Sequence, residues 1–221
     1  EDKNNCRNFL ISRAKIKNKS LIYEEFFRED KCAGFIQGGR MQQFTFENKQ
    51  GLIFSIADNL ADQPNNDPQS DNSNFGKIIF KSFDKEKKIV FSKGHRNPQG
   101  LLVLDEVILE TEHGPMGGDE INKIIYKGNY GWPISSYGKK YGSSEAYKQS
   151  HEELGFLGPV FSFVPSIGIS ELIKIPNSFN ERWQENFLVS SLNKLCLFRV
   201  KFDQNFNKVI YYEEIFIGQR I

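Results

Sequence analysis

Cysteine, histidine and charge of one sign are all scarce in this sequence of 221 residues. The three cysteines, Cys6, Cys32 and Cys196, include no C-x-x-C pair, which argues against a zinc site and against thioredoxin-like chemistry. At most one disulfide can form within the chain. In an oxidising compartment Cys6 would pair with Cys32, and free thiols are an equally good alternative.

Charge and long apolar runs are also limited. Lys and Arg number 29, Asp and Glu number 28, the formal net charge is +1, and no long run carries one sign. The sequence therefore gives no electrostatic support for binding nucleic acid or an anionic membrane surface. No stretch approaches the ~18 apolar residues of a membrane span, and the opening EDKNNCRNFL lacks the regions of a signal peptide. We expect a soluble protein whose export signal, if any, has been removed or lies outside this chain.

Several catalytic motifs are missing too. The histidines are His95, His113 and His151, and none has a G-x-S-x-G serine nearby or belongs to an H-E-x-x-H motif. The glycine pairs of GGR and GGDE lack the spacing of a phosphate-binding loop. A hydrolase triad, a catalytic zinc site and a nucleotide-binding loop are therefore disfavoured.

What the sequence does contain is short runs of Ile, Val, Leu and Phe, each followed by a turn with Gly, Asn or Asp. This pattern predicts an all-β fold. Three pairs of runs repeat along the chain: LIFSIADN with KIIFKSFD, VILETEHG with INKIIYKG, and FLVSSLNK with LCLFRVKFD. The repeat is typical of the four-stranded blades of a β-propeller, with coincidence among short strands as the alternative. At ~40 to 50 residues per blade, the chain would supply four or five blades, as a small ring or as part of a longer protein.

In a propeller, equivalent strands end at the same face around the axis, so polar residues just after them converge. Asp58, His113 and Asn193 hold such positions. Two polar segments, residues 58–74 and 135–155, interrupt the strands, and the second contains a brief possible helix. Long loops of this kind are either binding loops or disordered.

Residues 111–132, TEHGPMGGDEINKIIYKGNYGW, combine acids with Gly-Pro, Gly-Gly and Asn-Tyr-Gly-Trp directly after an apolar run. Glycine and proline leave backbone carbonyls free to point outward, and carboxylates beside them complete the all-oxygen shell that Ca²⁺ prefers. The alternative is a tight turn in which Asp119 caps backbone groups and Glu120 is solvated.

A second polar loop precedes that window. In GHRNPQG (residues 94–100), Arg96 and Asn97 offer a planar cation and an amide, which suit a ligand with carboxylates or carbonyls. Pro98 places the pair on a loop, because proline ends a strand. The alternative is a structural turn that carries a surface arginine.

The motifs GHRNPQGL, EHGPMGGDEIN and NYGWP, in this order and at close spacing, strongly resemble the soluble sugar dehydrogenases that use pyrroloquinoline quinone, the glucose/sorbosone dehydrogenase family. The similarity extends from GGRMQQFTFENKQGLIFSIADN through VPSIGIS and FLVSSLNKLCLFRV to the terminal GQRI. The resemblance implies a six-bladed β-propeller of four-stranded blades. We expect residues 1–221 to form a single propeller domain of four to five blades, truncated at both ends.

By this resemblance, pyrroloquinoline quinone lies on the propeller axis with Ca²⁺ bound to its oxygens. The backbone carbonyls of Gly114 and Pro115 would hold the catalytic calcium, and Glu120 and Tyr130 would ligate calcium nearby. Asp58 would orient the catalytic base. The residues expected to contact the quinone or line its pocket are Arg96, Asn97, His113, Tyr141, Ser166, Asn193 and Arg220.

The implied reaction is oxidation of an aldose at its anomeric hydroxyl to a lactone, with hydride transfer to the quinone. In the family a histidine takes the hydroxyl proton, Ca²⁺ polarises the quinone, and an arginine, here Arg96, stabilises the developing charge. The partners implied are a small sugar and a separate electron acceptor. The family's usual location, periplasmic or secreted, is the expected one.

Three positions depart from the family's pattern. The place of the base histidine holds Ile36, which cannot accept a proton. The family's pocket lysine corresponds to Asn193, with Lys194 one residue away, and a second arginine after Arg220 would lie beyond Ile221. Loss of a general base usually costs ~10² to 10⁴ in rate. The alternative is therefore a catalytically degenerate propeller that binds calcium and a sugar or protein partner without turnover.

Overall fold

The computed structural model describes residues 7–34, 38–59, 66–143, 145–147 and 149–220. These residues form β-strands joined by turns, and the one helical element among them is the 3-10 turn η1 (Glu181–Trp183). No helix within these ranges has the length and apolar character needed to cross a membrane. The predicted all-β class is confirmed.

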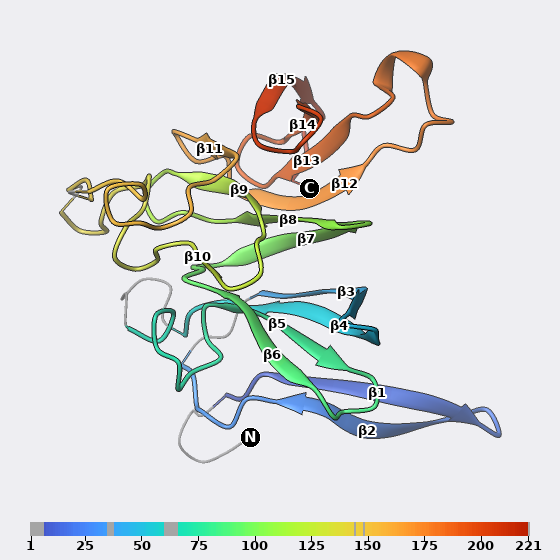
Figure 1. Ribbon diagram of the computed structural model, residues 1–221. Helices are drawn as coiled ribbons and strands as arrows, with labels where there is room; N and C mark the ends of the chain where they lie inside the picture. Colours follow the sequence, from blue (N-terminus) through green and yellow to red (C-terminus); the bar gives the residue numbers. More distant parts are fainter. Residues whose placement is uncertain (1–6, 35–37, 60–65, 144, 148, 221) are drawn as a thin grey trace.

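The strands form four sheets that follow one another in chain order, from the blue sheet to the red one in Figure 1. The first is the hairpin of β1 (Leu10–Lys17) and β2 (Ser20–Arg28). The second has the order β10-β6-β5-β4-β3 and comprises β3 (Gly38–Phe46), β4 (Lys49–Ile56), β5 (Lys77–Ser82), β6 (Lys88–Lys93) and β10 (Gly128–Asn129). The third, in the order β11-β9-β8-β7, comprises β7 (Pro98–Leu104), β8 (Val107–Glu112), β9 (Asp119–Lys123) and β11 (Phe161–Phe163). The fourth, in the order β12-β13-β14-β15, comprises β12 (Ile169–Lys174), β13 (Phe187–Ser191), β14 (Cys196–Phe202) and β15 (Val209–Phe216).

The three repeated pairs of runs correspond to equivalent neighbours in three sheets. They are the antiparallel pairs β4 with β5, β8 with β9, and β13 with β14. The first strands of these sheets also meet, since β3 contacts β7 and β7 contacts β12. Sheets that pack face to face around their innermost strands are the blades of a propeller.

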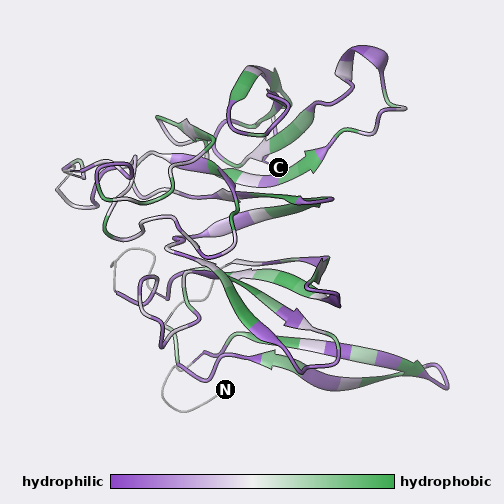
Figure 2. Cartoon of the chain, viewed as in Figure 1, coloured by the Kyte–Doolittle hydropathy of each residue, from purple (hydrophilic) through white to green (hydrophobic). Residues whose placement is uncertain are grey.

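The core lies between successive sheets, because the central strands are apolar on both faces. In β4, Phe54 packs against Phe9 and Phe27 at ring-centroid distances of 6.3 and 4.9 Å. The neighbouring Ile53 points the other way and belongs to the core that contains Leu101 of the third sheet. In Figure 2 the central strands of the second sheet carry much of the apolar colour, whereas the β1–β2 hairpin is largely hydrophilic. A strand buried on both faces is nearly continuously apolar in sequence, which explains why the runs stood out.

The two polar segments are loops in the structure. The expected brief helix in 135–155 is wrong: the described residues of that segment form turns, bends and isolated bridges at Lys139 and Ala146, since glycines at 138, 142 and 155 interrupt it. Within 58–74, the described residues after 65 form turns, and residues 60–65 lie outside the described part.

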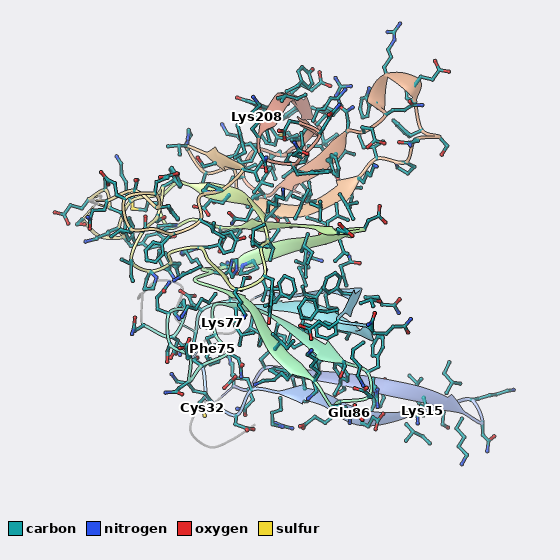
Figure 3. The ribbon with its side chains drawn as sticks, viewed as in Figure 1. Lys15, Cys32, Phe75, Lys77, Glu86 and Lys208 are labelled. Atoms are coloured by element: carbon teal, nitrogen blue, oxygen red, sulfur yellow. The ribbon has the colours of Figure 1, made fainter. Side chains whose placement is uncertain are left out.

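A buried lysine holds the loop of residues 58–74 in place. Lys77 is fully buried, and its Nζ donates to the backbone carbonyls of Asp67, Pro68 and Phe75 at 2.8, 2.8 and 3.0 Å. Figure 3 shows Lys77 beside Phe75 on the loop side of the second sheet. The ammonium group supplies the donor to the Phe75 carbonyl and a second donor to the carbonyls of Asp67 and Pro68, which also accept from the N–H groups of Ser70 and Gly94.

The cysteines differ in state. Cys32 is disulfide-bonded, whereas Cys196 is a free thiol that is fully buried in β14. Cys6 lies outside the described residues. Burial raises the pKa of the Cys196 thiol to about 11, so this side chain acts as a small apolar group of the core.

Candidate functional site

The loop after β6 and the loop after β8 lie against each other. The Nη1 of Arg96 donates to the His113 carbonyl at 3.0 Å, and the Arg96 backbone N–H donates to Glu112 Oε2 at 2.6 Å. Only 5% of Arg96 is exposed, so the alternative of a surface arginine is wrong. The guanidinium thus lies beside the Gly-Pro loop, as the resemblance requires.

Two aromatic rings and a carboxylate fix the orientation of Arg96. Its guanidinium carbon lies 5.3 Å from the ring centroid of Trp132 and 5.8 Å from that of Tyr141. The Trp132 Nε1–H donates to Asp58 Oδ2 at 2.7 Å, and the Asp58 N–H donates to the Arg96 carbonyl at 2.8 Å. Each cation–π contact is worth about 0.5 to 2 kcal/mol, depending on desolvation. Asp58 therefore acts on the pocket through Trp132 and does not line it.

An open pocket of about 330 Å³ lies in front of Arg96. Its volume falls within the ~300 to 1,000 Å³ typical of small-molecule sites. Every residue predicted to contact the quinone or line its pocket borders it, and so do both predicted carbonyl ligands of calcium. The lining residues are Arg96, Asn97, His113, Gly114, Pro115, Asp119, Tyr141, Ser166, Gly168, Leu192, Asn193 and Arg220. The structure brings these residues together, and their roles as ligands stay predictions.

The carboxylate of Asp119 holds the floor of this pocket. Its Oδ1 accepts from Ser166 Oγ at 2.8 Å and from the Gly114 N–H at 3.2 Å. Its Oδ2 accepts from the backbone N–H groups of Ile167 and Ile169 at 3.0 and 2.9 Å. The capping role considered for Asp119 is therefore correct. The carboxylate ties the loop after β8 to the chain that enters β12.

The Gly-Pro loop is tightly folded. A Cβ added to Gly114 would lie 2.1 Å from the Gly117 carbonyl oxygen, so the close approach of these backbone segments requires glycine. The neighbouring Pro115 carbonyl accepts from the Tyr141 hydroxyl at 3.0 Å. Tyr141 thus contacts both the cationic and the carbonyl side of the pocket.

Glu120 and Tyr130 border a separate cavity of about 10 Å³ behind Arg96. Glu120 is only 6% exposed, so a solvated role for it is wrong, and burial together with Glu112 raises its pKa. The Tyr130 hydroxyl donates to the Lys123 carbonyl at 2.5 Å and accepts from the Ile125 N–H at 2.9 Å. The side-chain oxygen of Tyr130 is therefore committed to the protein. Its carbonyl lies 3.0 Å from the Nε2 of His151, which also borders this cavity.

His113 is the one imidazole on the 330 Å³ pocket within the described part of the chain. Its Nε2 lies 2.5 Å from the Ile169 carbonyl, so the Nε2–H donates there and Nδ1 keeps its lone pair. Ile36, at the family's base position, lies outside the described residues, and the second arginine would lie beyond Ile221. Asn193, the third, is exposed on the pocket wall.

Sequence reasoning missed several residues around the site. Trp132 lies in the NYGWP motif, but the motif predicts no role for it, and neither Glu112 nor His151 is identified from the sequence. A signal existed for Glu112, because Ile108, Glu110 and Glu112 alternate along β8 and so share one face. No local signal marks His151, which reaches the cavity from a long loop.

The family model described as Glucose / Sorbosone dehydrogenase matches residues 2–221. Over 107 residues (47% of this chain, 29% of the relative) the chain is 35% identical to the aldose sugar dehydrogenase YliI of Escherichia coli strain K12. Over 53 residues (24% of this chain, 11% of the relative) it is 47% identical to quinoprotein glucose dehydrogenase B of Acinetobacter calcoaceticus.

Solved structures give the same fold. The apo form of the soluble aldose sugar dehydrogenase from Escherichia coli superposes with a TM-score of 0.80 at 24% identity, covering 96% of this chain and 65% of that one. The PQQ-bound aldose sugar dehydrogenase from Streptomyces coelicolor gives a TM-score of 0.70 at 22% identity, covering 96% and 60%. The chain therefore spans less than two thirds of the length of these relatives, and the predicted β-propeller fold is confirmed.

Proposed function

The chain belongs to the glucose/sorbosone dehydrogenase family, and from this premise we propose that it is a quinoprotein sugar dehydrogenase. The reaction is oxidation of an aldose at its anomeric hydroxyl, with hydride transfer to pyrroloquinoline quinone and electrons passed on to a separate acceptor. One observation carries the proposal. The Arg96 guanidinium and the Gly114–Pro115 loop border the same open pocket of about 330 Å³.

The residues of this pocket fit the cofactor. Pyrroloquinoline quinone is a planar quinone that carries carboxylates, and Arg96 and Arg220 supply positive charge while Asn97, Ser166 and Asn193 supply polar groups. The carbonyls of Gly114 and Pro115 are oxygen ligands of the kind that Ca²⁺ binds. When bound, the quinone accepts the hydride and Ca²⁺ polarises it.

The protein's own contribution is to orient and to move a proton. Contacts with Trp132 and Tyr141 and the bond to the His113 carbonyl restrict the Arg96 guanidinium, so it is preorganised to stabilise negative charge. With Ile36 in place of the base histidine, His113 Nδ1 is the pocket nitrogen that has a free lone pair to accept the hydroxyl proton.

A catalytically degenerate propeller is the second candidate. It is favoured by Ile36 at the family's base position and by the neutral Asn193 where the family has a lysine. In that case the pocket would bind calcium and a sugar or a protein partner without turnover.

Reconstitution separates the two functions. The purified protein is mixed with Ca²⁺ and pyrroloquinoline quinone, quinone binding is measured by fluorescence quenching, and dye reduction is assayed with a panel of aldoses. We expect binding and turnover, a loss of quinone affinity of about tenfold or more in Arg96→Met, and a lower rate with unchanged quinone affinity in His113→Gln. Arg182→Met, which alters an exposed arginine of η1, is the matched control. Binding without turnover for any aldose would favour the degenerate propeller, and no binding would contradict the quinoprotein assignment.

The proposed location is the periplasm or the exterior. The disulfide at Cys32 supports it, because such bonds persist in oxidising compartments.

A further inference from the structure

A second polar cluster lies between the second and third sheets, and its members His95, Glu110 and Asn122 do not line the open pocket. Its members are His95, which follows β6, and Glu110, Glu112 and Asn122 of β8 and β9. The pairing register places Glu110 opposite Asn122 and Glu112 opposite Glu120, so these side chains share one face. His95, Glu110 and Asn122 are fully buried, and Glu112 is 4% exposed.

The cluster holds more acceptors than donors. The amide nitrogen of Asn122 is the shared partner of Glu110, Glu112 and Glu120, at 3.1, 3.0 and 3.3 Å. An amide nitrogen carries two hydrogens, so it cannot satisfy three carboxylates. Buried carboxylates without enough donors are costly unless a cation or a proton neutralises them.

Three buried atoms of the cluster have no hydrogen-bond partner among the described residues: His95 Nδ1, Glu110 Oε1 and Asn122 Oδ1. The His95 ring is fixed, because its Nε2 contacts Ser92 Oγ at 2.8 Å and its face stacks on Tyr130 at 4.7 Å. If the Nε2–H donates to Ser92, a lone pair on Nδ1 points into the cluster, 3.5 Å from Glu112 Oε1.

We propose that His95, Glu110 and Glu112 form a binding site for a divalent cation of the Zn²⁺ or Mn²⁺ class. One ligand atom from each of the three residues lies within 4.8 Å of the others. Ligands bound at ~2.0 to 2.2 Å lie somewhat closer together, so small side-chain rotations would close the site. The imidazole nitrogen selects a transition-metal ion over Ca²⁺, which prefers oxygen alone.

This site differs from both predicted calcium positions. Those use the carbonyls of Gly114 and Pro115 and the pair Glu120 and Tyr130, whereas this one needs His95 and Glu110. An ion bound here would join the loop that leaves the second sheet to the central strand of the third. Its consequence would be a more stable contact between two blades, independent of quinone and sugar.

The test measures metal uptake. Protein stripped with a chelator is dialysed against Zn²⁺ or Mn²⁺ in excess Ca²⁺, and bound metal is counted by elemental analysis. Co²⁺ serves as a spectroscopic probe, because its visible absorption reports nitrogen ligation. We expect close to one ion per chain and a raised unfolding midpoint. Glu110→Gln should bind at least about tenfold more weakly. Glu106→Gln, an exposed acid in the turn before β8, is the matched control and should bind as the original chain does.

His95→Gln is the second variant, for use if Glu110→Gln does not fold, and it should abolish the Co²⁺ spectrum. Three results would overturn the proposal: no uptake, as expected if His95 and Glu112 simply share a proton; full competition by Ca²⁺; or uptake that neither variant changes. Neither quinone nor sugar is present in this assay, so its outcome is separate from that of the reconstitution experiment.

Discussion

Asp119 offers the sharpest test of how the pocket is held together. Its carboxylate is 1% exposed and accepts four hydrogen bonds, from the N–H groups of Gly114, Ile167 and Ile169 and from the Ser166 hydroxyl. In Asp119→Ala all four donors lose their acceptor. Ile167 and Ile169 are themselves buried, and each unsatisfied buried N–H costs about 1 to 3 kcal/mol, so we expect a loss of about 3 to 5 kcal/mol.

Asp119→Asn should cost less. With its oxygen in the Oδ2 position, the amide keeps the bonds from Ile167 and Ile169, and its nitrogen can donate to Ser166, whose hydroxyl can turn to accept. Only the Gly114 N–H loses its acceptor, because it then faces the amide nitrogen of the asparagine. The three hydrogen bonds that remain are no longer made to a charged group. We therefore expect about 2 kcal/mol for this variant.

Urea denaturation followed by tryptophan fluorescence measures both values. Asp105→Asn, a substitution of an exposed acid in the turn between β7 and β8, is the matched control and should lie within about 0.5 kcal/mol of the original chain. The reasoning fails if both Asp119 variants match this control, or if the asparagine variant is less stable than the alanine variant.

Three further predictions concern other buried groups. Lys77→Met leaves the Phe75 carbonyl without its donor and takes one of two donors from the carbonyls of residues 67 and 68, so we expect a loss of about 1 to 3 kcal/mol by urea denaturation, and none for the exposed Lys208→Met. Cys196, with its pKa raised to about 11 by burial, should resist iodoacetamide at neutral pH until the protein unfolds; rapid labelling of the native state would contradict its position in the core. Trp132→Phe keeps a ring under Arg96 but removes the 2.7 Å bond to Asp58, so stability should fall by about 1 to 2 kcal/mol, and an unchanged unfolding midpoint would remove Asp58 from the support of Arg96.

The fold could be predicted because its determinants are local. Ile53 and Phe54 face opposite cores, so β4 is an uninterrupted apolar run, and the same holds for the strands that repeat it. Turns with Gly, Asn or Asp then mark the strand ends. The number of strands in each sheet is harder to predict from the sequence, because β10 joins the second sheet from a distant part of the chain.

The pocket was predicted through motifs, and the buried cluster was not predicted at all. In β8, Ile108, Glu110 and Glu112 alternate with Leu109 and Thr111, a pattern that usually places the acids in water. Here that face packs against the second sheet, so the same alternation buries both carboxylates. Likewise, the burial of Arg96 depends on Trp132 and Tyr141, far along the chain, and nothing in GHRNPQG indicates it.

Three repeated positions show how one architecture yields different roles. Asp58, His113 and Asn193 each follow the second strand of a sheet, namely β4, β8 and β13. The three side chains nevertheless differ in how deeply they are buried. His113 and Asn193 border the pocket, whereas Asp58 is 2% exposed and acts through the Trp132 indole. The difference arises because the Trp132 side chain lies between the side chains of Asp58 and Arg96. The second sheet therefore contributes a residue that supports Arg96, whereas the third and fourth sheets contribute residues that line the pocket. The fold therefore determines where the residue after each second strand lies. The role of that residue depends on which side chain of a neighbouring loop contacts it.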